Sequence, residues 1–235
     1  MKLLPGIKTV IALAAVILAT ALLMGVTMRG TGLPEYAGPS LENPFTINDN
    51  PYLNDNGMDD GHSGDAVCGI KIDAARGKYF LKTFIDRDSA EKNGFKITHY
   101  GQCGTCSTLQ DLNVYKTNPD LTRAVRKCSI TLMHKSWAMN CLKKLGFSEH
   151  CAETWYYNMV NTGRKCFPVC ALSWLKGEDY NNPDGSLNAC LACDEKESGP
   201  VFKRCAGRTR RNSGIASEIK RSGGEVHHLV HDYIQ

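Results

Sequence analysis

The sequence predicts an α+β fold that is mainly helical: a small disulfide-rich ectodomain with a minor antiparallel β-hairpin, preceded by one N-terminal transmembrane helix. Three observations lead to this prediction. Residues 9–28 contain no charged side chain, and all eleven cysteines lie at or after Cys68. Apolar residues also recur at helical spacing through much of the chain between residues 107 and 176. With 235 residues, of which 42% are hydrophobic and 22% charged, the composition suits an ordinary folded protein of one or two domains.

Residues 9–28 read TVIALAAVILATALLMGVTM and have the length of a membrane span. Twenty helical residues at about 1.5 Å each extend roughly 30 Å, which is the thickness of a hydrocarbon core. Lys2 and Lys8 precede the run and Arg29 follows it, so the positive-inside rule keeps residues 1–8 in the cytosol and exports the rest. We therefore predict a signal anchor. A cleaved signal peptide is the alternative, although the run is longer than the usual apolar core of such a peptide.

Residues 29–67 are predicted to form a flexible acidic linker. From residue 30 to residue 67 the chain has seven acids, no Lys or Arg, and many Gly, Pro, Asn and Asp residues. Such a segment buries too little apolar surface to offset its ordering entropy. Residues 68–235 then form the cysteine-rich extracytoplasmic domain, where 25 bases against 17 acids give a net charge near +8. This charge favours a solvated surface, with an anionic partner surface as the alternative.

Two segments of the domain have the pattern of β-strands. Residues 79–85 (YFLKTFI) are aromatic and β-branched, and residues 95–100 (FKITHY) alternate apolar and polar side chains. Asn93 and Gly94 supply turn residues just before the second segment. We expect these two strands to form a small antiparallel pair.

Four helices are predicted between the strands and a turn-rich C-terminal part. Residues 107–115 form the first, and residues 129–145 form a longer one with Ile130, Met133, Trp137 and Cys141 on one side. Ser148 is a good N-cap for a third helix that ends at residues 161–163. Residues 167–176 form the fourth, with a proline in its first turn. From residue 178 onward we expect turns.

The cysteines indicate an oxidising compartment. Disulfides persist outside the cytosol, where small domains use them to supplement a modest core. Each native bridge adds roughly 2–4 kcal/mol to the free energy of unfolding, so stability explains the cysteines before any chemistry is invoked. Eleven is odd, so at least one thiol is left over, and the connectivity is open. The disulfide candidates are Cys68, Cys128, Cys141, Cys151, Cys166, Cys170, Cys190, Cys193 and Cys205.

Cys103-Gly104-Thr105-Cys106 is the sharpest catalytic candidate. It follows a predicted strand and precedes a predicted helix, which resembles the active-site context of the thioredoxin-like family. That resemblance implies a thiolate stabilised by a helix dipole, with Cys103 as the nucleophile and Cys106 as the resolving thiol. The alternative is structural, with each cysteine bridged elsewhere. A second CxxC at Cys190 and Cys193 lies too far from the first for the usual spacing of a zinc site.

His227, His228 and His231 are the candidate metal ligands. On a helix, His227 and His231 would share a face at the spacing of zinc ligands. The H-E-x-x-H order of a zinc hydrolase is absent, because Glu225 precedes the histidines. Histidines on a solvated surface near a terminus are the simpler interpretation. A basic run from Lys203 to Arg211 is likewise interpreted as a solvated face, with phosphate or anionic lipid contact as the alternative.

These observations favour a single-pass membrane protein of the secretory pathway or cell surface whose C-terminal domain is extracytoplasmic. The domain is expected to bind or to serve a structural role without catalysis, and no cofactor is expected. The expected partners are the membrane, through residues 9–28, and a protein or anionic surface, with no nucleic acid. One alternative is a membrane-anchored thiol–disulfide oxidoreductase using Cys103 and Cys106. The other is a metal-binding protein using the C-terminal histidines.

Overall fold

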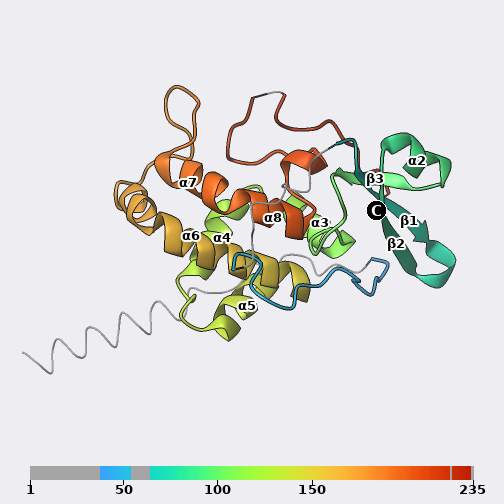
Figure 1. The fold of residues 1–235 in the computed structure, drawn as a ribbon, viewed down its shortest axis with the longest axis horizontal. Helices are drawn as coiled ribbons and strands as arrows, with labels where there is room; N and C mark the ends of the chain where they lie inside the picture. The colour runs from blue at the N-terminus through green and yellow to red at the C-terminus, as the bar shows by residue number, and fades with distance from the viewer. Residues whose placement is uncertain (1–37, 54–63, 223, 234–235) are drawn as a thin grey trace, which may run out of the picture. The chain divides into compact units, whose positions relative to one another are not determined.

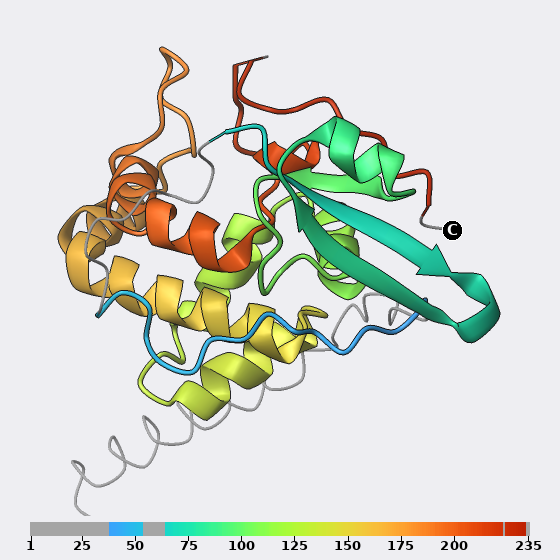
Figure 2. The same cartoon turned by 45° about the vertical axis from the view of Figure 1, so that its right-hand side comes forward.

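Residues 38–53, 64–222 and 224–233 are described in this computed structural model, and they belong to one unit, Tyr36–Gln235. In these residues the fold is α+β and mainly helical, with one small antiparallel sheet and five disulfides, as predicted. The sheet lies at one side of the helices (Figures 1 and 2). The predicted transmembrane segment 9–28 lies outside the described residues. Among the helices that are described, none combines the length and hydropathy needed to cross a bilayer.

The sheet has three strands in the order β2-β1-β3: β1 (Val67–Asp73), β2 (Lys78–Phe84) and β3 (Lys96–Tyr100). Both predicted strands exist, but their predicted pairing is wrong, because β1 lies between them and pairs with each antiparallel. Gly69 of β1 allows this arrangement. A Cβ there would lie 2.9 Å from atoms of both Phe84 and Phe95, and those two rings pack at 5.0 Å over the strand.

Short elements connect the strands. A 3-10 turn, η1 (Ala74–Arg76), joins β1 to β2, and the hairpin that they form projects away from the helices (Figure 2). Helix α2 (Arg87–Lys92) is preceded by Asp86, whose side chain accepts a hydrogen bond from the Ser89 N–H and caps the helix. The predicted turn before β3 is confirmed, because Gly94 has a φ of +74° that favours glycine.

The helical part contains α3 to α8 and one 3-10 turn. The first predicted helix corresponds to α3, capped by Thr108. The elements are α3 (Leu109–Thr117), α4 (Leu121–Ser129), α5 (Lys135–Lys144), α6 (Glu149–Leu175), α7 (Ala189–Glu197), α8 (Gly199–Ala206) and η2 (Arg211–Ser213).

The long helix predicted at residues 129–145 is wrong, because a turn at residues 130–134 separates α4 from α5. Ile130 and Met133 belong to that turn and Trp137 to α5. All three are exposed, Met133 to 94%. Their helical spacing therefore runs across a break between two helices. A Cys128–Cys141 disulfide joins the two short helices.

The two helices predicted at residues 148–163 and 167–176 are one continuous helix, α6. Asn161 and Thr162 do not end it, because their side chains bond to the α7–α8 junction and not to their own backbone. The Asn161 amide donates to the Glu197 carbonyl at 2.9 Å, and the Thr162 and Ser198 hydroxyls lie 2.8 Å apart. Pro168 lies inside the helix on an exposed side.

Helices α7 and α8 replace the turns that we expected after residue 178. Asn188 caps α7 by accepting a hydrogen bond from the Leu191 N–H at 2.9 Å. Pro200, which has the character of a turn residue, lies in the first turn of α8, where its missing N–H costs nothing. Two disulfides attach α7 to α6.

The main core lies among α3, α4, α5, α6 and α8. Leu142, Phe147 and Ala152 are fully or almost fully buried there, together with the Cys106–Cys151 disulfide. Two smaller clusters lie on the sheet, and Leu229 and Tyr233 near the C-terminus pack against them. The C-terminal segment thus belongs to the folded domain.

Residues 38–53 differ from the flexible linker that we predicted. Ser40 pairs with β2 near Lys78, and the Asn43 amide donates to the Thr105 carbonyl at 3.0 Å. The Tyr52 hydroxyl reaches Asn158 of α6 at 2.9 Å. Polar and aromatic side chains therefore fix this part of the predicted linker to the domain.

Candidate functional site

The structure does not bring the two cysteines of the first CxxC together as a pair. Cys103 is bonded to Cys68 of β1, and Cys106 is bonded to Cys151 of α6. An exchange centre of the CxxC type needs both sulfurs to form one reversible disulfide. Helix α3 begins only at Leu109, so its N-terminus is not at the expected nucleophile.

The loop around this CxxC packs directly against the backbone at the C-terminal end of α8. The Thr105 and Cys106 N–H groups donate to the carbonyls of residues 205 and 206, at 3.0 and 2.9 Å. A Cβ on Gly104 would lie 2.5 Å from the Cys205 carbonyl oxygen, so only glycine permits the approach. Both sulfurs are buried. The loop therefore ties the sheet to α6 and α8.

Eight of the nine disulfide candidates form bridges. The second CxxC behaves like the first, because Cys190 pairs with Cys170 and Cys193 with Cys166. Cys205 belongs to none of the five disulfides. The connectivity was open from sequence because the two CxxC pairs had several possible partners.

The C-terminal histidines do not lie on a helix, and the shared helical face expected for them is absent from residues 224–233. His227 stacks on Tyr100 with ring centroids 4.2 Å apart. Both ring nitrogens of His231 are engaged, at 2.8 Å from the Ser213 carbonyl and from the Tyr233 hydroxyl. Burial lowers the pKa of His231 to about 4, so the ring is neutral at pH 7. In the described part of the chain, no group of three or more His, Cys, Asp or Glu side chains is arranged to hold a metal ion.

Arg208, in the predicted solvated basic run, is fully buried. Its guanidinium donates to the carbonyls of Thr98, Cys106 and Ser107 at 2.9 to 3.1 Å, and to the Thr98 hydroxyl at 2.6 Å. The fixed fork of an arginine suits such a set of acceptors. The interpretation of a solvated face was therefore wrong at this residue, which joins β3, the CxxC loop and the C-terminal segment.

A histidine and a serine also meet in this interior. The His99 ring lies 2.7 Å from the Ser107 hydroxyl, which in turn accepts from the Gly104 N–H at 2.8 Å. Both side chains are fully buried. A nucleophile needs an open approach for the reacting atom, so this pair serves the structure.

Asp111 is a fully buried acid of the interior. It accepts hydrogen bonds from the Thr108 hydroxyl and from the N–H and hydroxyl of Ser148, at 2.5 to 2.8 Å. Burial raises its pKa to about 6, against the lowering effect of these donors. Its bonds link the N-termini of α3 and α6, which is a positioning role within the fold.

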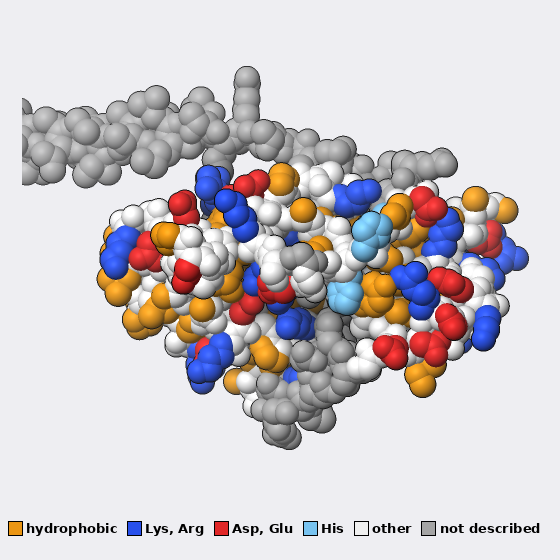
Figure 3. Space-filling view, turned by 90° about the horizontal axis from the view of Figure 1, so that it is seen from above, with side chains coloured by type: hydrophobic (Ala, Val, Ile, Leu, Met, Phe, Trp, Pro, Cys, Tyr) orange, Lys and Arg blue, Asp and Glu red, His pale blue; other side chains and the backbone are white. Residues whose placement is uncertain are grey.

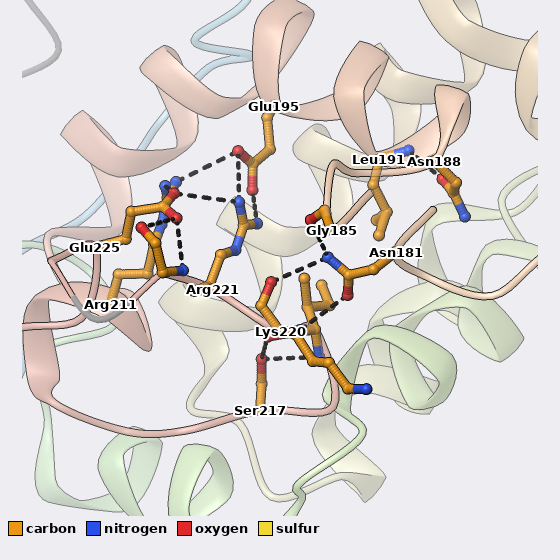
Figure 4. Close-up of polar contacts among 12 residues, drawn as sticks. Asn181, Gly185, Asn188, Leu191, Glu195, Arg211, Ser217, Lys220, Arg221 and Glu225 are labelled. Carbon is orange, nitrogen blue, oxygen red and sulfur yellow. Dashed lines mark hydrogen bonds and ion pairs between the residues drawn. The ribbon is translucent and has the colours of Figure 1, made fainter. Parts of the chain in front are cut away.

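A network of two acids and two arginines attaches the C-terminal segment to α7 (Figure 4). Arg221 bonds to Glu195 of α7 and lies 3.8 Å from Glu225. Arg211 approaches the same two carboxylates at 3.6 and 3.7 Å. The two arginines balance the two glutamates in charge. The network therefore holds the C-terminal segment against α7 and presents no net charge to a ligand.

The C-terminal half of α6 presents the most unusual surface among the described residues. Large apolar side chains on the last turns of the helix are exposed to solvent. Hydrophobic side chains gather at that end of the molecule (Figure 3). Leu175 is exposed to 82%, Phe167 to 68% and Trp174 to 65%. We define the apolar α6 face as Phe167, Val169, Leu172, Trp174 and Leu175.

The sequence contains the signal for this face, because all five residues lie in the helix predicted at residues 167–176, but it does not show which side of that helix is covered. Once α6 is continuous, Cys166, Cys170 and Ser173 fall on one side of it and face α7. The remaining positions of the same turns are apolar and uncovered. The alternative of an anionic contact predicted from sequence concerned the basic run from Lys203 to Arg211 and not this face.

The comparisons with known proteins add one family match. Residues 135–229 match a family of unknown function (DUF8771). The matched segment covers less than half of the chain, and contains both α6–α7 disulfides and the whole apolar α6 face. No curated protein and no solved structure matches the chain.

Proposed function

We propose that this chain is a membrane-anchored binding protein, whose disulfide-stabilised domain lies on the non-cytosolic side and acts through contact without catalysis. Residues 9–28 serve as its anchor, and the apolar α6 face is its contact surface.

One observation carries this proposal: both CxxC pairs are used in long-range disulfides. Ten of the eleven cysteines join segments between 13 and 45 residues apart, and no bridge closes a CxxC. Bridges of this kind restrict the unfolded chain and support a small core. Their number also fits an oxidising compartment, which the predicted export of the domain supplies.

Two measurements test the proposal together. Peptide mapping of the unreduced protein is expected to return the five long-range pairs, and a Cys103–Cys106 linked peptide as the main species would overturn the non-catalytic assignment. Membrane topology is tested with the substitution Pro183→Ser, which creates an N-glycosylation acceptor at Asn181. The variant is translated in the presence of microsomes, and glycosylation shows that residue 181 has reached the lumen.

The matched control for topology is Pro183→Ala, which changes the same exposed loop but creates no acceptor. Export predicts a glycosidase-sensitive gain in mass for Pro183→Ser and none for the control. The anchor predicts that the chain stays with the membranes after carbonate extraction. An unmodified, extractable chain would refute both the topology and the anchor.

A further inference from the structure

The exposed arc of the apolar α6 face is too wide for an ordinary amphipathic surface helix. At about 100° per residue, the five side chains of the face spread over roughly 220° of the helix circumference. A surface helix normally has its apolar stripe covered and its opposite side polar. Here the covered side holds Cys166, Cys170 and Ser173, and the uncovered side is apolar. Contiguous apolar patches of this kind mark interaction sites.

Acidic and basic side chains lie at opposite ends of α6, and the bases next to the apolar α6 face favour an anionic partner. Its acids, Glu149 and Glu153, lie in the first turns, and no acid follows them within the helix. Arg164 and Lys165 precede the apolar α6 face and are exposed. Lys176 follows the face and is also exposed, and it pairs with Glu178 at 3.6 Å. Trp and Phe between flanking bases are typical of segments at a lipid–water interface, where the bases meet anionic headgroups.

The helix is already built and held rigid. Cys166 and Cys170 attach its covered side to Cys193 and Cys190 of α7. Many interfacial helices form only on the membrane and lose conformational entropy there. A prebuilt helix avoids that cost on binding.

We propose that the apolar α6 face lies in the interface of the anionic bilayer to which the chain is anchored, with Trp174 and its apolar neighbours among the lipid headgroups and upper acyl chains. This inference rests on the proposed anchor at residues 9–28. The chain from residue 28 to residue 38 reaches at most about 35 Å, so the domain stays close to the membrane surface. A second copy of the chain is a poorer occupant, because the face would bring like charges together.

The test uses the full chain in proteoliposomes of phosphatidylcholine and phosphatidylglycerol with brominated acyl chains, which quench tryptophan fluorescence at contact. The chain has three tryptophans, all within the domain: Trp137, Trp155 and Trp174. Part of the emission is expected to be quenched. That part is lost in Trp174→Phe and retained in Trp137→Phe, the matched control, which changes an exposed tryptophan of α5.

A charge variant separates the apolar and electrostatic contributions. Arg164→Glu with Lys165→Glu is expected to lower the ratio of lipid-bound to unbound face in anionic vesicles by at least about 30-fold, because the two lost bases contribute roughly 1 kcal/mol each. Quenching is expected to fall accordingly. Lys71→Glu with Lys82→Glu, on the sheet, serves as the matched charge reversal and is expected to leave quenching unchanged.

Carbonate extraction of the same proteoliposomes reads the anchor separately. If the chain is retained but Trp174 is not quenched, the lipid proposal is overturned and the anchor stands. In that case, cross-linking into a dimer through the face would assign it to a second copy, and capture of a defined protein would assign it to a partner. If the chain is extracted, the proposed anchor is refuted, and the lipid proposal that rests on it is refuted with it.

Discussion

Replacing Cys166 and Cys193 together by alanine removes one of two nested bridges between α6 and α7. The two bridges close sequence separations of 27 residues and, for Cys170–Cys190, of 20 residues. The chain-entropy relation gives about 3.5 and about 3.3 kcal/mol for closing these loops alone. Once either bridge exists, the other closes only a ring of about eight residues, for which the same relation gives about 2.5 kcal/mol.

The nested geometry therefore predicts costs that do not add. Loss of either bridge alone is expected to lower the free energy of unfolding by about 2 to 2.5 kcal/mol, while loss of both lowers it by about 6 kcal/mol. The excess arises because each single variant still has the other bridge to restrict the same stretch of unfolded chain. Interaction energies of this size are typical of coupled sites.

Urea unfolding of the unit Tyr36–Gln235, with the oxidised protein and the three variants, measures these costs. That unit contains every cysteine and the described core. The control removes the Cys128–Cys141 bridge between α4 and α5, which shares no loop with the α6–α7 pair and should add to either single variant. Additive losses for the nested pair would contradict the chain-entropy explanation of how these two bridges stabilise the fold.

Three further predictions concern the interior. Arg208→Met is expected to lower the free energy of unfolding by about 3–5 kcal/mol in urea titrations, because it leaves buried carbonyls without donors; a loss below about 1 kcal/mol would contradict this. Gly104→Ala should destabilise severely through its clash with the backbone near residue 205, while Gly163→Ala, with open space in a helix, should stabilise by about 0.5–1 kcal/mol. Between pH 4 and 6, two groups change the free energy of unfolding in opposite directions as the pH rises. The raised pKa of Asp111 contributes stability at low pH that is lost as pH rises through about 6, by about 3 kcal/mol in total. The lowered pKa of His231 contributes stability above about 6.5 that is lost as pH falls through about 4. Asp111→Asn should therefore show stability that only rises with pH over this range in urea titrations, and an unchanged slope would refute the assignment.

The sequence predicted two of the three strands and the fold class, because those rest on local patterns. The residues of β2 and β3, and the glycine turn before β3, have side-chain alternation and turn chemistry that need no tertiary information. The pairing of the strands was missed because β1 was not predicted as a strand, and its Gly69 gains a role only when Phe84 and Phe95 meet over it.

The helices show where local signals fail. Asn161 and Thr162 look like helix breakers, yet their side chains find partners on α7 and α8, so tertiary contacts override the local preference. The burial of Arg208 has the same origin, since its acceptors come from residues about 100 positions away in the chain. The candidate contact surface was missed for a related reason: its residues lie in one predicted helix, but which side of that helix is covered depends on the disulfides to α7.

The disulfide pattern also has a consequence for the order in which the protein matures. All eleven cysteines lie in described residues, and no bridge joins a cysteine up to Cys151 with one from Cys166 onward. Three crosslinks can therefore be completed by an oxidase while ribosomes are still adding the last third of the polypeptide. The two remaining crosslinks then involve only late-made cysteines, so vectorial synthesis itself reduces the number of mispaired intermediates.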